Sequence, residues 1–114
     1  MIVEDDPFIA VDLEDAYLEA GFEVMGPFVS SESALAALEA RATAPDVATL
    51  DYNLTDGTSR PVASVLAKLG VPFLMVTSEA DAIRRRPLFR DRPVFPKPFD
   101  LSVLVGHSVR LAAA

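Results

Sequence analysis

The sequence predicts an α/β fold in which helices cover both faces of a parallel sheet. Short apolar runs alternate with longer amphipathic segments along the whole chain, as strands and helices do in such folds. The runs are apolar throughout, which indicates strands buried on both faces. The chain has 114 residues, of which 51% are hydrophobic and 24% charged, as in a single globular domain. We therefore expect a doubly wound, five-stranded sheet with five helices in one domain over residues 1–114.

The first three elements are predicted from residues 1–25. Met1-Ile2-Val3 is an apolar run that stops at three acidic residues, and it predicts the first strand. Asp6 and Pro7 suit the cap and the first position of a helix. Apolar residues spaced three and four apart continue this helix to Ala20. Phe22–Met25 predicts the second strand.

The middle of the chain repeats the same alternation. Gly26-Pro27 closes the second strand, and Ser30-Ser31 predicts the cap of a second helix. Val47–Asp51 predicts the third strand. The third helix is predicted at Pro61–Leu69 and ends at Gly70.

The remaining elements follow in the same order. Phe73–Thr77 predicts the fourth strand, and the polar segment Glu79–Arg86 predicts a short helix that a proline ends. Val94-Phe95 predicts a brief fifth strand. The last helix is predicted at Leu101–Leu111, with Asp100 as its cap.

Composition excludes several classes of function. The sequence contains no cysteine, which excludes a disulfide scaffold, a thiolate metal site and a cysteine nucleophile. No apolar run approaches the roughly 20 residues that span a bilayer, and the first residues do not resemble a signal peptide. We therefore expect a cytoplasmic protein with no membrane partner.

The charge is distributed unevenly. The net charge is −7, but residues 1–56 hold thirteen acids and one base (−12), whereas residues 57–114 hold four acids and nine bases (+5). An acidic total disfavours binding of nucleic acid through its phosphates. It makes a cation or a basic protein surface the more natural ligand of the first half.

Reactive side chains are predicted at one edge of the sheet. Ligands of open parallel sheets bind beyond the carboxyl ends of the strands. The residues at or just after the ends of the first, third, fourth and fifth strands are Glu4, Asp5, Asp51, Thr77 and Lys97. Three carboxylates, a hydroxyl and an ammonium group are therefore expected to converge.

These groups suit phosphoryl transfer. Clustered carboxylates need a shared cation to stay ionised, and an all-oxygen site suits Mg²⁺. A carboxylate beside Mg²⁺ and a lysine can attack a phosphoryl group, because both cations neutralise charge on the transferring oxygens. The product is an aspartyl phosphate on Asp51. Thr77 is expected to donate a hydrogen bond to the phosphoryl group, and Lys97 to form an ion pair with it.

At these positions the sequence resembles the receiver domains of two-component response regulators. The resemblance covers nearly the whole chain and is carried by Ile2–Pro7, Asp51–Leu54, Val76–Ser78 and Lys97–Phe99. The segment Pro72–Glu79 is similar to the fourth strand of single-domain receivers with the motif Pro-Phe-x-Phe-Ala-Thr-Gly-Tyr. The resemblance implies a flavodoxin-like strand order of 2-1-3-4-5 and a cis peptide bond before Pro98.

The resemblance also implies roles for individual residues. The acidic pair of the family corresponds to Glu4 and Asp5, and its phosphoacceptor to Asp51. The carbonyl that completes the magnesium shell corresponds to the main-chain carbonyl of Asn53. The switch hydroxyl corresponds to Thr77, and the lysine to Lys97. The implied phosphoryl donor is a histidine kinase or a phosphotransfer protein. Such a domain catalyses its own phosphorylation and dephosphorylation rather than the turnover of a separate substrate. It signals through contacts with a downstream protein or by passing the phosphoryl group onward.

One position departs from the usual family pattern, and two others bear on the lifetime of the phosphoryl group. Val94 stands where most receivers have a tyrosine or phenylalanine that follows the threonine, and Phe95 should point to the opposite face of the sheet. The sequence therefore leaves the switching route open. The polar residues Asn53 and Glu79 stand where the family controls the access of water, so we expect a short-lived phosphoryl group.

Two other functions fit parts of the sequence. The segment Asp51-x-Asn53-x-Thr55 resembles the nucleophile motif of haloacid-dehalogenase-like phosphatases, although Asn53 replaces their second aspartate. The replacement of the switch aromatic by Val94 also fits an interaction domain that works without phosphorylation. Outside the site, we expect the arginines of residues 84–92 to be a solvated face, Asp56-Gly57 to be a turn, and His107 to be a surface or packing residue.

Overall fold

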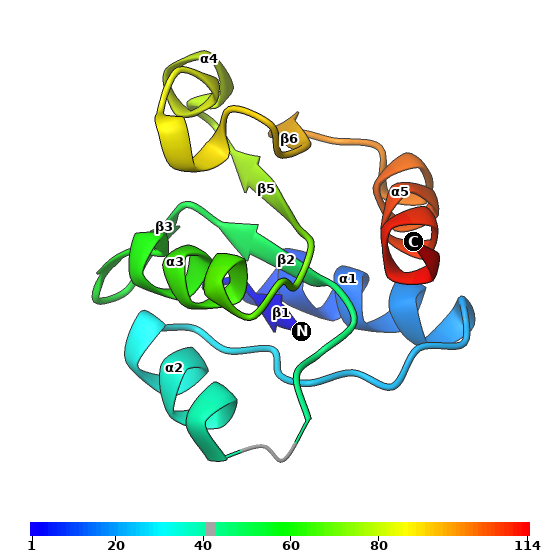
Figure 1. Cartoon of the computed structure of the whole chain (residues 1–114). Coiled ribbons are helices and arrows are strands. Elements are labelled where there is room, and N and C mark those ends of the chain that lie inside the picture. The colour runs from blue at the N-terminus through cyan, green and yellow to red at the C-terminus, as the bar shows by residue number, and fades with distance from the viewer. Residues whose placement is uncertain (41–42) are drawn as a thin grey trace.

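The protein is built on a four-stranded parallel sheet. The computed structural model describes residues 1–40 and 43–114. In spatial order, the strands are β1 (Ile2–Val3), β2 (Ala48–Asp51), β5 (Phe73–Thr77) and β6 (Val94–Pro96) (Figure 1). They coincide with the predicted first, third, fourth and fifth strands, in the predicted order. All three pairings are parallel, so the carboxyl ends of the four strands lie at one edge.

The prediction of a second strand at Phe22–Met25 is wrong, because the structure has no strand there. This segment runs beside β1, where Ile2 N–H donates to the Met25 carbonyl at 3.0 Å. In a regular parallel ladder the residue two further on would donate back to Ile2. That residue is Pro27, which has no N–H, and Phe28 N–H donates instead at 2.9 Å. The extra residue interrupts the ladder and leaves a single bridge between Val3 and Phe28.

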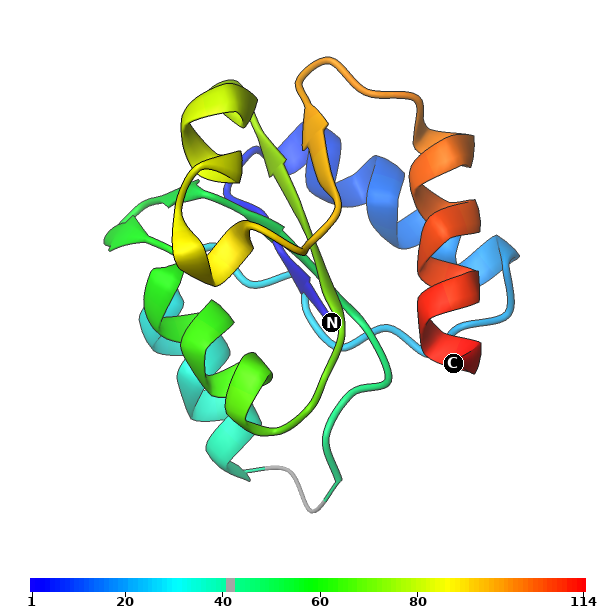
Figure 2. The ribbon, with the colours of Figure 1, turned by 45° about the horizontal axis from the view of Figure 1, so that its top comes forward.

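Five α-helices among the described residues agree with the predicted number. They are α1 (Pro7–Glu19), α2 (Ser31–Ala40), α3 (Arg60–Lys68), α4 (Ala80–Arg84) and α5 (Leu101–Ala113). A short 3₁₀ helix, η1 (Pro87–Phe89), follows α4. Helices α1 and α5 lie on one side of the sheet, and α2 and α3 lie on the other (Figure 2). The fold is therefore doubly wound, as predicted. None of the described helices has the length and apolar character needed to cross a membrane.

Each face of the sheet has its own apolar core. Leu13, Tyr17, Val76 and Leu104 are buried together beneath α1 and α5. The core beneath α2 and α3 is larger, and its fully buried members include Leu50, Val62, Leu66, Phe73, Met75 and Phe89. Adjacent residues of β5, Met75 and Val76, therefore contribute to opposite cores, as strand geometry requires.

The predicted helix caps are present. The Asp6 carboxylate accepts hydrogen bonds from Phe8 N–H at 2.9 Å and Ile9 N–H at 3.3 Å. Asp100 accepts from Val103 N–H at 3.1 Å. These bonds satisfy N–H groups that have no partner within the first turn of a helix.

A small antiparallel hairpin follows β2 and was not predicted. Its strands are β3 (Asn53–Leu54) and β4 (Gly57–Thr58). Asp56 lies in the two-residue loop between them, which agrees with the predicted turn. Gly57 has a φ of 127°, a conformation that glycine adopts without strain.

Val94 and Phe95 point to opposite faces of the sheet, as predicted. Val94 packs against the core beneath α2 and α3, whereas Phe95 packs in the core beneath α1 and α5. The ring of His107 lies edge-on to Phe95, with centroids 5.9 Å apart, so His107 is a packing residue. The peptide bond between Lys97 and Pro98 is cis, as the resemblance implies, and the bond between Gly26 and Pro27 is also cis.

The arginines of residues 84–92 are only partly a solvated face. Arg86 lies over the ring of Tyr52, 5.6 Å from its centroid, and Arg92 lies over Phe73 at 4.2 Å. Arg84 donates to the Val94 carbonyl at 2.9 Å. Three of the five arginines therefore hold the α4 and η1 region against the rest of the domain.

Candidate active site

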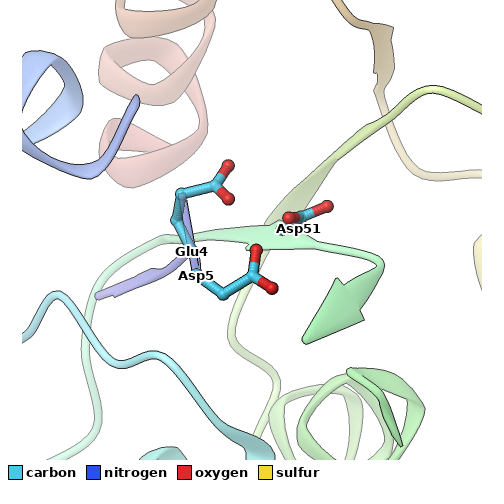
Figure 3. Close-up of side chains that lie close together, drawn as sticks. All are labelled: Glu4, Asp5 and Asp51. Carbon is cyan, nitrogen blue, oxygen red and sulfur yellow. The ribbon is translucent and has the colours of Figure 1, made fainter. Parts of the chain in front are cut away.

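The predicted reactive residues converge at the carboxyl edge of the sheet. Glu4 and Asp5 follow β1, and Asp51 is the last residue of β2. Each offers a carboxylate oxygen within 4.8 Å of those of the other two. Figure 3 shows the three carboxylate groups gathered in one place. Glu4 and Asp51 are buried, while Asp5 is partly exposed, so the cluster is accessible from the side of Asp5.

Lys97 closes this cluster from the other end of the chain. Its Nζ lies 3.2 Å from Asp51 Oδ2 and 3.2 Å from Glu4 Oε1. The second Glu4 oxygen accepts from Asp6 N–H at 3.1 Å. One ammonium group thus contacts two buried carboxylates, and Asp5 is left as a third acid beside them.

The electrostatics of the cluster show an excess of negative charge. Burial, followed by the neighbouring Glu4 carboxylate, raises the pKa of Asp51 to about 6, although Lys97 acts in the opposite direction. Burial and the nearby Asp51 also raise the pKa of Asp5. Burial disfavours the charged form of Lys97, but attraction to Asp51 and Glu4 outweighs it and raises the pKa of the lysine. A second cation would therefore stabilise the ionised carboxylates.

The donor set fits a hard divalent cation. All three side chains offer carboxylate oxygens, the ligands that Mg²⁺ prefers, and the partly exposed Asp5 leaves room for water. The resemblance implies that the main-chain carbonyl of Asn53 is a further ligand of the magnesium ion. Asn53 lies in β3, two residues after Asp51. Its side-chain amide donates to Glu79 Oε2 at 3.2 Å, which links β3 to the segment between β5 and α4.

Thr77 is buried at the end of β5, in the position predicted for the switch hydroxyl. Its Oγ1 accepts a hydrogen bond from Glu79 N–H at 3.0 Å, just before α4 begins. A hydroxyl that accepts one hydrogen bond still has its own proton to donate. Thr77 can therefore contact a ligand in the site and the start of α4 at the same time.

Sequence reasoning missed two contacts made by residues that follow Asp51. The ring of Tyr52 lies edge-on to Phe89 of η1, with centroids 5.9 Å apart. The carboxylate of Asp56 binds the N-terminus of α2. Both contacts join residues at least 24 positions apart. The only local signal is the Asp56-Gly57 turn, and a turn does not indicate which distant residue its side chain contacts.

The chain is similar to solved structures, although no family model matches it. No curated protein matches it either. Among solved structures, SdrG from Sphingomonas melonis Fr1 is 36% identical with a TM-score of 0.78, and the match covers 99% of this chain and 93% of SdrG.

Two further structures belong to PhyR proteins. The PhyR response regulator REC domain from Erythrobacter litoralis is 26% identical, with a TM-score of 0.79, over 98% of this chain and 86% of that one. The response regulator PhyR from Brucella abortus is 29% identical, with a TM-score of 0.79. That match covers 98% of this chain but 46% of PhyR, so the likeness is confined to part of the longer protein.

Proposed function

Because the chain belongs to the response regulator receiver domains, we propose that it accepts a phosphoryl group on Asp51. The donor is a phosphohistidine of a histidine kinase or a phosphotransfer protein. The observation that carries the proposal is the contact of Lys97 with Asp51 beside Glu4 and Asp5. This arrangement combines a nucleophilic carboxylate, a fixed cation and two further acids that suit a metal ion.

The transfer exchanges one bond to phosphorus for another. A carboxylate oxygen of Asp51 attacks phosphorus, and the bond between phosphorus and the donor imidazole nitrogen breaks. The donor imidazole, which is protonated on its other ring nitrogen, keeps the electron pair of that bond and leaves as a neutral ring. Lys97 forms an ion pair with a phosphoryl oxygen, and Thr77 donates a hydrogen bond to another.

The acidic residues hold the metal in this proposal. Asp5 and Asp51 would provide carboxylate ligands, and the main-chain carbonyl of Asn53 would provide a third ligand. Glu4 would add negative charge and orient Lys97. When bound, Mg²⁺ supplies positive charge that stabilises the phosphoryl oxygens during transfer. Water later hydrolyses the aspartyl phosphate, so the domain catalyses its own dephosphorylation and has no separate substrate.

Phosphorylation then changes how the domain binds other proteins. Thr77 is bonded to the start of α4, so a shift of its hydroxyl toward the phosphoryl group alters the segment that begins at Ser78. We propose that a downstream protein reads this change, or that a second phosphotransfer protein receives the phosphoryl group. We propose that the domain itself acts in the cytoplasm.

Intact-mass spectrometry tests the acceptor chemistry. The protein is incubated with Mg²⁺ and acetyl phosphate, and we expect one phosphoryl addition that is absent from Asp51→Asn. If no addition occurs and beryllofluoride with Mg²⁺ also fails to bind, the phosphoacceptor function is wrong. An interaction domain that works without phosphorylation then becomes the better explanation. Sustained turnover of a small phosphate ester would instead favour the phosphatase alternative.

A further inference from the structure

The β3–β4 hairpin directly after Asp51 is too small to hold its own shape. Each strand has two residues, and isolated two-stranded hairpins are marginally stable in water even when they are longer. The hairpin nevertheless includes Asn53, from which the proposed function draws a metal ligand. Its conformation must therefore be fixed by contacts with the rest of the domain.

The strongest of these contacts is made by Asp56. Its Oδ1 accepts from Ser31 N–H at 2.9 Å, and its Oδ2 accepts from Glu32 N–H at 3.0 Å. These are the first N–H groups of α2, which have no partner within the helix. The two hydrogen bonds lower the pKa of Asp56, so the carboxylate is ionised at neutral pH and favourably placed at the helix N-terminus.

Two uncharged contacts reinforce the same connection. Thr55 donates to the Val29 carbonyl through its N–H at 3.3 Å and through its hydroxyl at 3.0 Å. The hydroxyl of Ser31 donates to the Thr58 carbonyl at 2.8 Å. Together with Asp56, these bonds fasten the tip of the hairpin to the segment that leads into α2.

The other end of the hairpin is fixed to the active site. Asn53 pairs with Thr58 across the hairpin. Ser59 N–H donates to the Tyr52 carbonyl at 2.8 Å, and Tyr52 N–H donates to the Val76 carbonyl at 3.3 Å. The hairpin is thus held at its base by the sheet and at its tip by the contacts with α2 and the segment before it.

We propose that Asp56 is a positioning residue for the divalent cation: by binding α2, it holds the Asn53 main chain beside Asp51. The inference rests on the proposed function, because it concerns the metal ligands assigned there. Asp56 itself does not contact the cation. A ligand held in its binding conformation before the cation arrives loses less freedom on binding, which increases affinity. The contact with α2 therefore contributes to Mg²⁺ affinity from outside the site.

Titration of the full chain with Mg²⁺, followed by calorimetry or NMR, tests this role. We expect Asp56→Ala to weaken Mg²⁺ binding by about tenfold, as changes outside the metal ligands commonly do. Asp56→Asn removes the charge but keeps one acceptor, so a smaller loss is expected. Thr55→Val removes a hydroxyl contact without changing the charge, and it should also weaken binding. Hydrogen exchange should be faster in residues 52–59 of each variant.

The control separates position from charge. Glu39→Gln removes one negative charge from the exposed far end of α2, about two turns from the helix N-terminus that Asp56 binds. If Asp56→Ala weakens Mg²⁺ binding no more than Glu39→Gln does, and Thr55→Val binds normally despite faster exchange, the positioning role is wrong. If Asp56→Ala does not fold, Thr55→Val and Asp56→Asn decide the question.

The outcome for the unmodified protein separates the two proposals. If that protein binds Mg²⁺ and is phosphorylated while the Asp56 and Thr55 variants bind Mg²⁺ equally well, only the positioning role fails. If the unmodified protein neither binds Mg²⁺ nor reacts at Asp51, the proposed function fails and the positioning role fails with it.

Discussion

Lys97 Nζ lies 3.2 Å from Asp51 Oδ2, although 46 residues separate the two in the sequence. The same nitrogen lies 3.2 Å from Glu4 Oε1. The loop after β6 is therefore joined to the ends of β1 and β2 by charge as well as by the sheet. Because both acids are buried, the lysine is their counterion in the absence of metal.

Removal of this counterion should destabilise the metal-free protein. Lys97→Met leaves two buried carboxylates without their cation, and we expect the free energy of unfolding to fall by about 1–3 kcal/mol. Urea unfolding in EDTA measures the change. Lys68→Met is the matched control, since Lys68 is exposed at the end of α3, and it should stay within about 0.5 kcal/mol of the unmodified protein. Equal stability of the two variants would show that the Lys97 contacts contribute nothing.

The raised pKa of Asp51 predicts a pH dependence of stability. An unfolded aspartate titrates near pH 4, whereas Asp51 titrates at about 6 in the folded protein. Between these values the folded state binds more protons, so the contribution of Asp51 to the free energy of unfolding falls as pH rises from about 4 to 6. Asp51→Asn should remove this contribution. Urea unfolding of both proteins in EDTA is the measurement, and a difference that does not change with pH would contradict the assignment.

Thr77 should affect both stability and reactivity through one hydroxyl. Thr77→Val keeps the shape of the side chain but leaves Glu79 N–H without its acceptor. We expect a loss of about 1 kcal/mol in unfolding free energy and slower phosphorylation by acetyl phosphate. Thr77→Ser retains the hydroxyl and should recover most of both properties. A Thr77→Val protein that reacts at the normal rate would exclude a role for the hydroxyl in transfer.

Phe89 should be a major source of stability for the η1 region. Its ring is fully buried and lies edge-on to Tyr52 and Phe73, with centroids 5.9 and 6.4 Å away. Phe89→Ala should cost about 3–5 kcal/mol in unfolding free energy. Phe8 is 82% exposed, so Phe8→Ala is expected to change stability by less than about 0.5 kcal/mol. Urea unfolding of the two variants tests the contrast.

The sequence predicted that the candidate site residues converge, because their positions depend on local patterns. Asp51, Thr77 and Lys97 each stand at or just beyond the end of an apolar run, and parallel strands bring such ends to one edge. Knowledge of the strands and their direction is then enough to place the side chains together. Exact contacts, such as the 3.2 Å approach of Lys97 to Asp51, depend on packing that a linear pattern does not contain.

The features that were missed or wrong depend on distant partners. Phe22–Met25 has the composition of a strand, but the missing N–H of Pro27 interrupts its ladder with β1. Asp56 was predicted only as a turn residue, because its partners in α2 lie 24 and 25 positions earlier. Arg86 was assigned to a solvated face, yet it lies over Tyr52. None of these contacts produces a repeating pattern of residues from which it could be predicted.

The hydrogen bond between Asn53 and Glu79 bears on the lifetime of the aspartyl phosphate. The Asn53 amide donates to Glu79 Oε2 at 3.2 Å, and both residues are exposed. Polar side chains at these two positions can hydrogen-bond a water molecule and orient it toward phosphorus. We therefore expect a short-lived phosphoryl group. Asn53→Leu and Glu79→Leu should each lengthen its life several-fold, because an apolar side chain excludes water without orienting it.

Loss of the phosphoryl group is followed by intact mass after acetyl phosphate is removed. Leu69 is an exposed apolar residue at the end of α3, so Leu69→Ala serves as a variant that should decay at the normal rate. If the aspartyl phosphate of the unmodified protein persists for many hours at neutral pH, the two polar residues do not promote hydrolysis. If only Glu79→Leu lengthens the lifetime, the carboxylate alone orients the water, and its hydrogen bond to the Asn53 amide does not affect hydrolysis.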